Sequence, residues 1–227
     1  MTLPDDSPLL RAVRVMDRLR SPGGCPWDAE QTHDSLRRYL VEECYELLQA
    51  IEDGDDAALR EELGDVLLQV LFHAGIASER SAQNGGFDID DVAAGLVDKL
   101  VRRHPHVFAD AAPIRTAADQ QVRWDELKQT EHGRSSVLAG VALGQPAVAL
   151  AAKLGSRAAK FGVEIDIPAG DSPAEQMFRI AYAAGAAGQD PESELRAVAK
   201  AHAARLAVVL PDVAAGDAST PELGRSN

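Results

Sequence analysis

The sequence predicts an all-α protein. Apolar residues recur with the 3.6-residue period of a helix along most of the chain, and no clear period-2 alternation indicates a strand. Capping residues, glycines and prolines separate these periodic stretches at lengths typical of helices. With 227 residues, the chain can form one domain or two small ones around a substantial core.

The first helix is predicted at residues 8–19 and is amphipathic, because its apolar residues have core spacing. A loop rich in glycine and proline, residues 21–28, ends it. Either Thr32 or Asp34 is expected to cap a second helix, which runs to about residue 52.

The turn at 53–56, Asp-Gly-Asp-Asp, leads from the second helix into a third at 57–78. Because this connection is short, the two helices are expected to form an antiparallel pair. The core stripe of the second helix is predicted to consist of Leu36, Leu40, Cys44, Leu47, Leu48 and Ile51, which makes Cys44 a buried thiol. In the third helix, apolar residues surround the axis and leave one polar seam, formed by Glu62, Asp65, Gln69 and His73.

Four carboxylates recur at i, i+3 spacing within this pair: Glu43 with Glu46, and Glu62 with Asp65. Residues three apart lie on one face of a helix, so each pair can direct two oxygens to one point. A solvated face balanced by arginines is the alternative, and it suits the acidic residues around the turn. It does not suit the four carboxylates, because a buried charge needs a partner or a metal. The pattern therefore predicts a site for Mg²⁺, with Mn²⁺ as a substitute.

Two further polar residues, Glu42 and His73, accompany these carboxylates. Glu42 lies further from the apolar stripe, so it could be a general base, an outer-shell ligand or simply exposed. His73 lies on the polar seam, and we expect it to hydrogen-bond a carboxylate rather than to bind a hard metal.

Further helices are predicted along the rest of the chain. One is capped by residues 88–90, runs to Arg103 and ends at Pro105, and the next, at 116–131, carries Trp124. Beyond Gly133 the composition shifts toward alanine, with helices at 146–161, 174–187 and 191–209. We therefore predict domains at 8–132 and 133–210 and a disordered tail at 211–227.

The net charge of −13 argues against stable nucleic-acid binding, which requires a positive footprint. An anionic substrate would need the one basic patch, which includes Lys99, Arg102 and Arg103. The same trio could instead stabilise a helix C-terminus, and both roles can hold together. No apolar run is long enough for a bilayer and no signal peptide is apparent, so we expect a cytoplasmic protein.

Four segments, read together, resemble the MazG family of nucleoside triphosphate pyrophosphohydrolases. They are Cys25-Pro26-Trp27-Asp28, Glu42-Glu43-x-x-Glu46, Glu62-Leu63-Gly64-Asp65 and the run Asp-Lys-Leu-Val-Arg-Arg-His-Pro-His-Val-Phe at 98–108. The resemblance spans about residues 9–131. It implies a four-helix core that binds Mg²⁺ through the two carboxylate pairs, in a homodimer or higher oligomer with sites near subunit contacts.

The activity implied is hydrolysis of a (d)NTP to (d)NMP and pyrophosphate. By matching motifs, Glu43, Glu46, Glu62 and Asp65 take the metal-ligand positions. Lys99, Arg102 and Arg103 take the place of the phosphate-binding run, and Trp124 that of an aromatic residue near the base. From the chemistry of the residues, Glu42 or Glu46 could orient or deprotonate the attacking water.

The segment from Pro146 looks like the opening of a second copy of the domain, with Lys153 and the run at 157–163. No Glu-Glu-x-x-Glu follows it, so we expect a degenerate, catalytically inactive half. Two other functions remain open. One is a narrow hydrolase of dUTP, a modified nucleotide or phosphoribosyl-ATP, and the other is a non-catalytic nucleotide-binding regulatory module.

Overall fold

The structure is a computed structural model of the whole chain, and it describes residues 7–109, 116, 119–120, 123 and 137–209. These residues form helices and turns without a strand, which confirms the all-α prediction. The chain divides into two units, Met1–Trp124 and Asp125–Asn227. Trp124, most of the helix predicted at 116–131, the boundary predicted at 132 and the tail at 211–227 lie outside the described residues.

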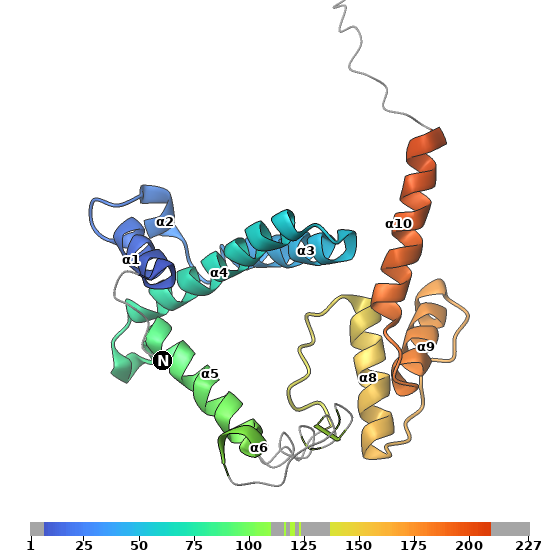
Figure 1. The fold of residues 1–227 in the computed structure, drawn as a ribbon. Helices are drawn as coiled ribbons and strands as arrows, with labels where there is room; N and C mark the ends of the chain where they lie inside the picture. The colour runs from blue at the N-terminus through green and yellow to red at the C-terminus, as the bar shows by residue number, and fades with distance from the viewer. Residues whose placement is uncertain (1–6, 110–115, 117–118, 121–122, 124–136, 210–227) are drawn as a thin grey trace, which may run out of the picture. The chain divides into compact units, whose positions relative to one another are not determined.

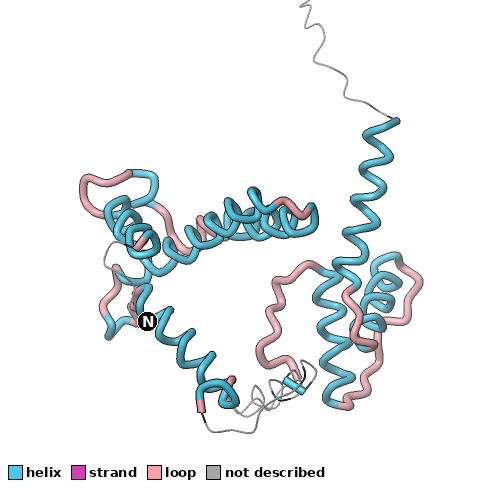
Figure 2. Tube along the Cα trace, viewed as in Figure 1, coloured by secondary structure: helices cyan, strands magenta, loops and turns pink. Residues whose placement is uncertain are grey.

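The first unit contains α1 (Pro8–Arg20), α2 (Pro26–Glu30), α3 (Arg37–Asp53), α4 (Asp56–Ser78), the 3₁₀ turn η1 (Ala82–Asn84), α5 (Ile89–Arg103) and α6 (Pro105–Phe108). Helices α3 and α4 run side by side as the predicted hairpin, and α5 departs from the end of α4 opposite the hairpin turn (Figure 1). The tube view shows that the turn between α3 and α4 is short, whereas longer loops lie on either side of α2 (Figure 2).

Local chemistry explains where the hairpin turns. Gly54 ends α3 with a left-handed φ of 67°, a conformation that costs glycine little. Asp55 then caps α4, since its Oδ1 accepts from the backbone N–H of Ala57 at 2.9 Å and of Ala58 at 3.1 Å. The two carboxylate helices are thereby held antiparallel.

The start of α3 differs from the prediction. The helix begins at Arg37 after Leu36, with no side-chain cap. Thr32 instead caps the preceding turn, where its Oγ1 accepts from the N–H of Ser35 at 3.1 Å, and Asp34 pairs with Arg37 at 3.0 Å. The polar side chains that we expected to cap the helix instead form their contacts within this turn and with Arg37.

The core of the first unit joins α1, the start of α3 and the second half of α4. Its fully covered members are Met16, Leu36, Leu71 and Phe72. Partly buried apolar residues pack around them: Ala12, Val13, Tyr39, Leu67, Leu68, Ile76 and Ile89. Ile89, in the first turn of α5, packs against this core and anchors the start of the helix.

The predicted apolar stripe of α3 is only half correct. Leu36 is buried, but Cys44, Leu48 and Ile51 are exposed, so Cys44 is not the buried thiol that we predicted. The face turned to α4 is instead formed by Leu36, Tyr39, Leu40, Glu43, Leu47 and Ala50. Helix α4 is likewise not covered all round within its unit, because Leu63 is 52% and Val70 39% exposed.

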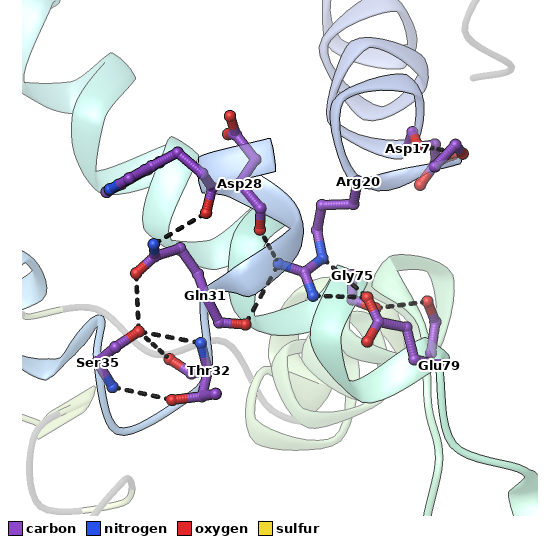
Figure 3. A network of polar contacts seen from close by, with 11 residues as sticks. Asp17, Arg20, Asp28, Gln31, Thr32, Ser35, Gly75 and Glu79 are labelled. Carbon is purple, nitrogen blue, oxygen red and sulfur yellow. Dashed lines mark hydrogen bonds and ion pairs between the residues drawn. The ribbon is translucent and has the colours of Figure 1, made fainter. Parts of the chain in front are cut away.

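A buried arginine connects α1, α2 and the end of α4 (Figure 3). The Arg20 side chain is 6% exposed, and its guanidinium donates to Glu79 Oε1 from Nε at 2.9 Å and from Nη2 at 2.6 Å. Its Nη1 donates to the backbone carbonyls of Asp28 and Gln31. This network fixes the loop that precedes α3. Trp27, in α2 just before this loop, packs edge-on against Tyr39 and Phe72, with ring centroids 6.0 and 6.2 Å away.

The second unit contains α8 (Ala147–Phe161), α9 (Pro173–Ala186) and α10 (Pro191–Val209). Its first two helices touch backbone to backbone. A Cβ at Gly155 would lie 2.0 Å from the carbonyl oxygen of Tyr182, and one at Gly185 would lie 2.0 Å from that of Ala152. Among the described helices of both units, none is long and apolar enough to cross a membrane.

Candidate metal site

Three of the four predicted ligands come together between α3 and α4. One carboxylate oxygen from each of Glu43, Glu62 and Asp65 lies within 4.8 Å of the other two, and all three residues are half-buried. A divalent cation held by oxygens lies about 2.0–2.6 Å from each of them, so ligands across such an ion are about 4–5 Å apart. The spacing and the oxygen donors of the cluster are therefore compatible with a divalent cation.

The carboxylates of the cluster repel one another. Burial raises the pKa of Glu43, and the carboxylates of Asp65, Glu46, Glu62 and Glu42 raise it further. Burial and then three neighbouring carboxylates likewise raise the pKa of Glu62. The Glu62 Oε2 atom is buried and has no hydrogen-bond partner. Since a buried carboxylate oxygen is costly unless it is satisfied, these residues suit a bound cation.

The fourth predicted ligand lies at the rim. Glu46 is exposed and falls outside the group of three, although its charge acts on both Glu43 and Glu62. It lines an open groove of about 400 Å³ with Tyr45, Gln49, Ala50, Asp53, Asp55, Ala58 and Glu62. Glu42 is exposed beside Glu43. Both residues are therefore accessible to solvent at the edge of the cluster.

The polar seam of α4 continues past the carboxylates to Gln69 and His73. Gln69 is 3% exposed, and its Oε1 atom has no hydrogen-bond partner. We predicted a hydrogen bond from His73 to a carboxylate, but in the described residues the side chain contacts another histidine. Its Nδ1 lies 2.8 Å from Nδ1 of His33, in the turn before α3. The prediction was wrong because it considered only α4, whereas the partner arrives from a loop that Arg20 holds in place.

The structure does not bring the predicted basic run to the carboxylates. Lys99 and Arg102 are exposed on α5, and Arg103 is buried where that helix ends. Among the described residues, every charge that acts on the pKa of Glu43 or Glu62 belongs to a carboxylate. Trp124, predicted near the base, lies outside the described residues.

Sequence reasoning missed two contributors, His33 and Arg20. His33 is a lone histidine in a polar loop, and Arg20 is a basic residue in the last turn of a helix, where cations are common. Neither residue carries a local signal, because each acts through a partner about 40 to 60 residues away. Spacing patterns that compare residues within one helix cannot detect such contacts.

Comparison with known proteins identifies the domain that carries these residues. The family model of the MazG nucleotide pyrophosphohydrolase domain matches residues 31–108, which hold the carboxylate hairpin and α5. The chain is 53% identical over 193 residues to an uncharacterized 26.1 kDa protein in the blaB 3′ region of Streptomyces cacaoi, covering 84% of this chain and 78% of that protein.

Two further relatives carry functional names. The nucleoside triphosphate pyrophosphohydrolase/pyrophosphatase MazG of Thermotoga maritima is 45% identical over 70% of this chain and 59% of its own length. The nucleoside triphosphate pyrophosphohydrolase of Escherichia coli K12 is 41% identical over 77% of this chain and 66% of its own length. The aligned part of this chain thus spans about three-fifths to two-thirds of these two relatives. With the matched domain and this degree of identity, the chain belongs to the MazG family of nucleotide pyrophosphohydrolases.

Proposed function

We propose that this protein is a Mg²⁺-dependent nucleoside triphosphate pyrophosphohydrolase that converts a (d)NTP to (d)NMP and pyrophosphate. The observation that carries the proposal is the convergence of Glu43, Glu62 and Asp65 oxygens within 4.8 Å of one another. It is supported by two relatives whose names state that activity. A protein that only bound nucleotides would not need a half-buried carboxylate cluster of this kind.

In this mechanism Glu43, Glu62 and Asp65 would hold the metal, and Glu46 would add a fourth carboxylate from the rim. A Mg²⁺ ion held there would supply positive charge to the triphosphate and lower the pKa of an attacking water. Glu46 or Glu42 accepts the proton of that water as it attacks the α-phosphorus, since both are exposed beside the cluster. Mn²⁺ can replace Mg²⁺, because it prefers the same oxygen ligands.

Other residues bind the two ends of the substrate. Lys99 and Arg102, the exposed members of the basic run, neutralise the departing pyrophosphate, and arginine suits bidentate phosphate contacts. Arg103 belongs to the same run, but it is buried, so we propose that it supports the run structurally. Trp124 stacks on the base, as aromatic side chains do with little base preference.

The cellular role that we propose is sanitation of the cytoplasmic nucleotide pool, by a homodimer or higher oligomer. Exposed apolar residues on α3, α4 and α5 support an oligomer, because they form patches rather than isolated positions. The second unit is proposed to be a degenerate copy that does not bind Mg²⁺. The proposal rests on the sequence, in which no Glu-Glu-x-x-Glu follows the segment that resembles the opening of a second copy.

Product analysis tests the proposal. Purified protein is incubated with each NTP and dNTP plus Mg²⁺, and the products of wild type, Glu43→Gln and Glu61→Gln are separated by ion exchange. Glu61 is the matched control, because it is an exposed glutamate next to the cluster. Monophosphate and pyrophosphate from wild type and Glu61→Gln, but not from Glu43→Gln, would support the assignment.

Other outcomes would redirect the assignment. Diphosphate with orthophosphate would show attack at a different phosphorus. Turnover confined to dUTP, a modified nucleotide or phosphoribosyl-ATP would select the narrow hydrolase. Nucleotide binding without turnover, unchanged in Glu43→Gln, would select the regulatory module.

A further inference from the structure

Two buried oxygens on the polar seam of α4 have no hydrogen-bond partner within the described residues. They are Oε2 of Glu62, in the carboxylate cluster, and Oε1 of Gln69, further along the same helix. Gln69 is the more deeply buried of the two residues, at 3% exposed. A buried oxygen is costly unless it accepts a hydrogen bond or binds a cation. The proposed metal meets this need for Glu62, and the Gln69 oxygen still requires a donor.

The side chains next to Gln69 on this seam do not supply that donor. Asp65 lies one turn before Gln69, and an ionised carboxylate offers oxygens that only accept hydrogen bonds. His73 lies one turn after it, and the Nδ1 atom of that ring contacts Nδ1 of His33. A bound molecule is therefore the remaining source of a hydrogen for the Gln69 oxygen, and it must reach a side chain that solvent hardly touches.

The direction of helical side chains brings Gln69 toward the carboxylate cluster. Side chains on an α-helix lean toward its N-terminus, and on α4 this is the direction from Gln69 to Asp65. Helix α3 runs antiparallel beside α4 (Figure 1). The same lean on α3 carries Glu43 away from the hairpin turn, which is the direction in which Gln69 lies. Both leans therefore shorten the distance between Gln69 and the cluster.

The spacing of Asp65 and Gln69 suits an indirect contact with the metal. One turn of helix, from Asp65 to Gln69, rises about 6 Å, whereas a direct bond from Mg²⁺ to oxygen is only about 2.1 Å long. A water on the metal that donates a hydrogen bond of about 2.8 Å covers the remaining distance. Mg²⁺ usually keeps several of its waters in protein sites. A buried water needs more than one polar partner, and the metal and the Gln69 oxygen supply two.

We infer that Gln69 Oε1 accepts a hydrogen bond from a water on the metal held by Glu43, Glu62 and Asp65. Gln69 is then a positioning residue, which fixes the orientation of one metal-bound water on the side of the cluster away from the hairpin turn. The open groove with Glu46 lies on the side toward that turn, so this water is separate from the one that attacks the substrate. A neutral carboxamide holds it without adding to the repulsion among the carboxylates. The inference rests on the proposed function for the identity of the metal site.

Calorimetric titration with Mg²⁺ tests the inference without turnover. Gln69→Met keeps the length of the side chain but has no oxygen, and we expect its dissociation constant for Mg²⁺ to rise about tenfold, as when an outer partner of a metal site is lost. Without metal, Gln69→Met should melt no lower than wild type, because it removes an unsatisfied buried oxygen. Gln69→Glu keeps an acceptor oxygen and should restore most of the affinity. Gln83→Met is the matched control, since Gln83 is an exposed glutamine in η1, and it should bind Mg²⁺ as wild type does.

The results separate a positioning role from a structural one. An affinity for Mg²⁺ in Gln69→Met equal to that of wild type would overturn the inference and leave the proposed function standing. A lower melting temperature of metal-free Gln69→Met would overturn it as well, because the Gln69 oxygen would then have a partner in the protein itself. Turnover gives an independent readout, since excess Mg²⁺ should return Gln69→Met to near wild-type kcat if the residue acts through the metal. A wild-type protein that bound no divalent cation would contradict the proposed function and this inference together.

Discussion

His33 and His73 meet end to end, with their Nδ1 atoms 2.8 Å apart. The ring planes are within 10° of parallel and the centroids are 5.1 Å apart, which is the separation of two imidazoles joined by an in-plane N–H···N bond. Such a bond needs one Nδ1 with a hydrogen and one without. The contact therefore exists while at least one ring is neutral, and a proton on both rings breaks it.

Stability of the first unit should therefore decrease as the pH falls. Burial and then the neighbouring His33 lower the pKa of His73 below its ordinary value of 6.5. Below pH 6.5 the unfolded chain takes up a proton that the folded chain does not, so the free energy of unfolding falls until the folded pKa is passed. We expect a loss of less than about 1 kcal/mol, because the pair is partly exposed. Tryptophan fluorescence in urea measures it, since both tryptophans precede residue 125.

Two variants isolate this effect from the titration of carboxylates. The charge that acts on the pKa of His73 is that of His33. Two acidic residues on adjoining segments, Asp34 and Glu79, pair with Arg37 and Arg20. His33→Asn should flatten the pH dependence relative to wild type, whereas His202→Asn in α10 should not. An unchanged pH profile in His33→Asn would show that the His33–His73 contact does not cause the pH dependence of stability.

Most helices could be predicted because their causes are local. The hairpin of α3 and α4 follows from Gly54, Asp55 and the periodic apolar residues on either side. The side of α3 that faces inward could not be predicted equally well, because two stripes of residues along this helix both have helical spacing. One contains Tyr39 and Ala50 and faces α4, and the other contains Cys44 and Ile51 and is exposed. Periodicity identifies both stripes, but it does not show which of them packs against another helix of the same chain.

The candidate site shows the same division. The i, i+3 spacing identified Glu43, Glu62 and Asp65, since side chains three apart on a helix are neighbours wherever the helix lies. The placement of the basic run could not be inferred from spacing, because it depends on the angle at which α5 leaves α4. The contact of His73 with His33 depends in turn on the fold of a loop.

Magnesium should stabilise the wild-type protein and not the Glu62→Gln variant. Burial and neighbouring carboxylates raise the pKa of Glu62, so its charge is unfavourable in the metal-free protein. We therefore expect Glu62→Gln to raise the melting temperature without metal and to lose the further rise with Mg²⁺. At a concentration 100 times the dissociation constant, a single site contributes about 2.7 kcal/mol. Thermal unfolding with and without Mg²⁺ measures both effects, with Glu61→Gln as the exposed control. A variant that still gained stability from Mg²⁺ would place the metal elsewhere.

Replacing Arg20 should loosen α2, which carries Trp27, and the following loop, which carries His33. Its guanidinium binds Glu79 and two backbone carbonyls from a position that is 6% exposed. Arg20→Ala removes several charge-assisted hydrogen bonds, and we expect a loss of about 2–4 kcal/mol in the first unit. Arg37→Ala is the matched control, because its pair with Asp34 is 79% and 86% exposed and contributes less than about 1 kcal/mol. Urea unfolding followed by tryptophan fluorescence compares them. Equal losses in the two variants would mean that the buried network adds nothing beyond a surface ion pair.

The close contact of α8 and α9 should not tolerate a methyl group. A Cβ at Gly185 would lie 2.0 Å from the carbonyl oxygen of Ala152, and that oxygen belongs to helix backbone that cannot move alone. Gly185→Ala must therefore separate the two helices, and we expect the second unit to lose more than about 2 kcal/mol. Gly144→Ala is the control, because nothing lies within 4 Å of its Cβ position. Hydrogen exchange of the α9 amides measures the opening of this unit. Protection that stays at the wild-type level in Gly185→Ala would mean that α8 and α9 do not pack backbone to backbone, and that the alanine-rich second unit is held together in another way.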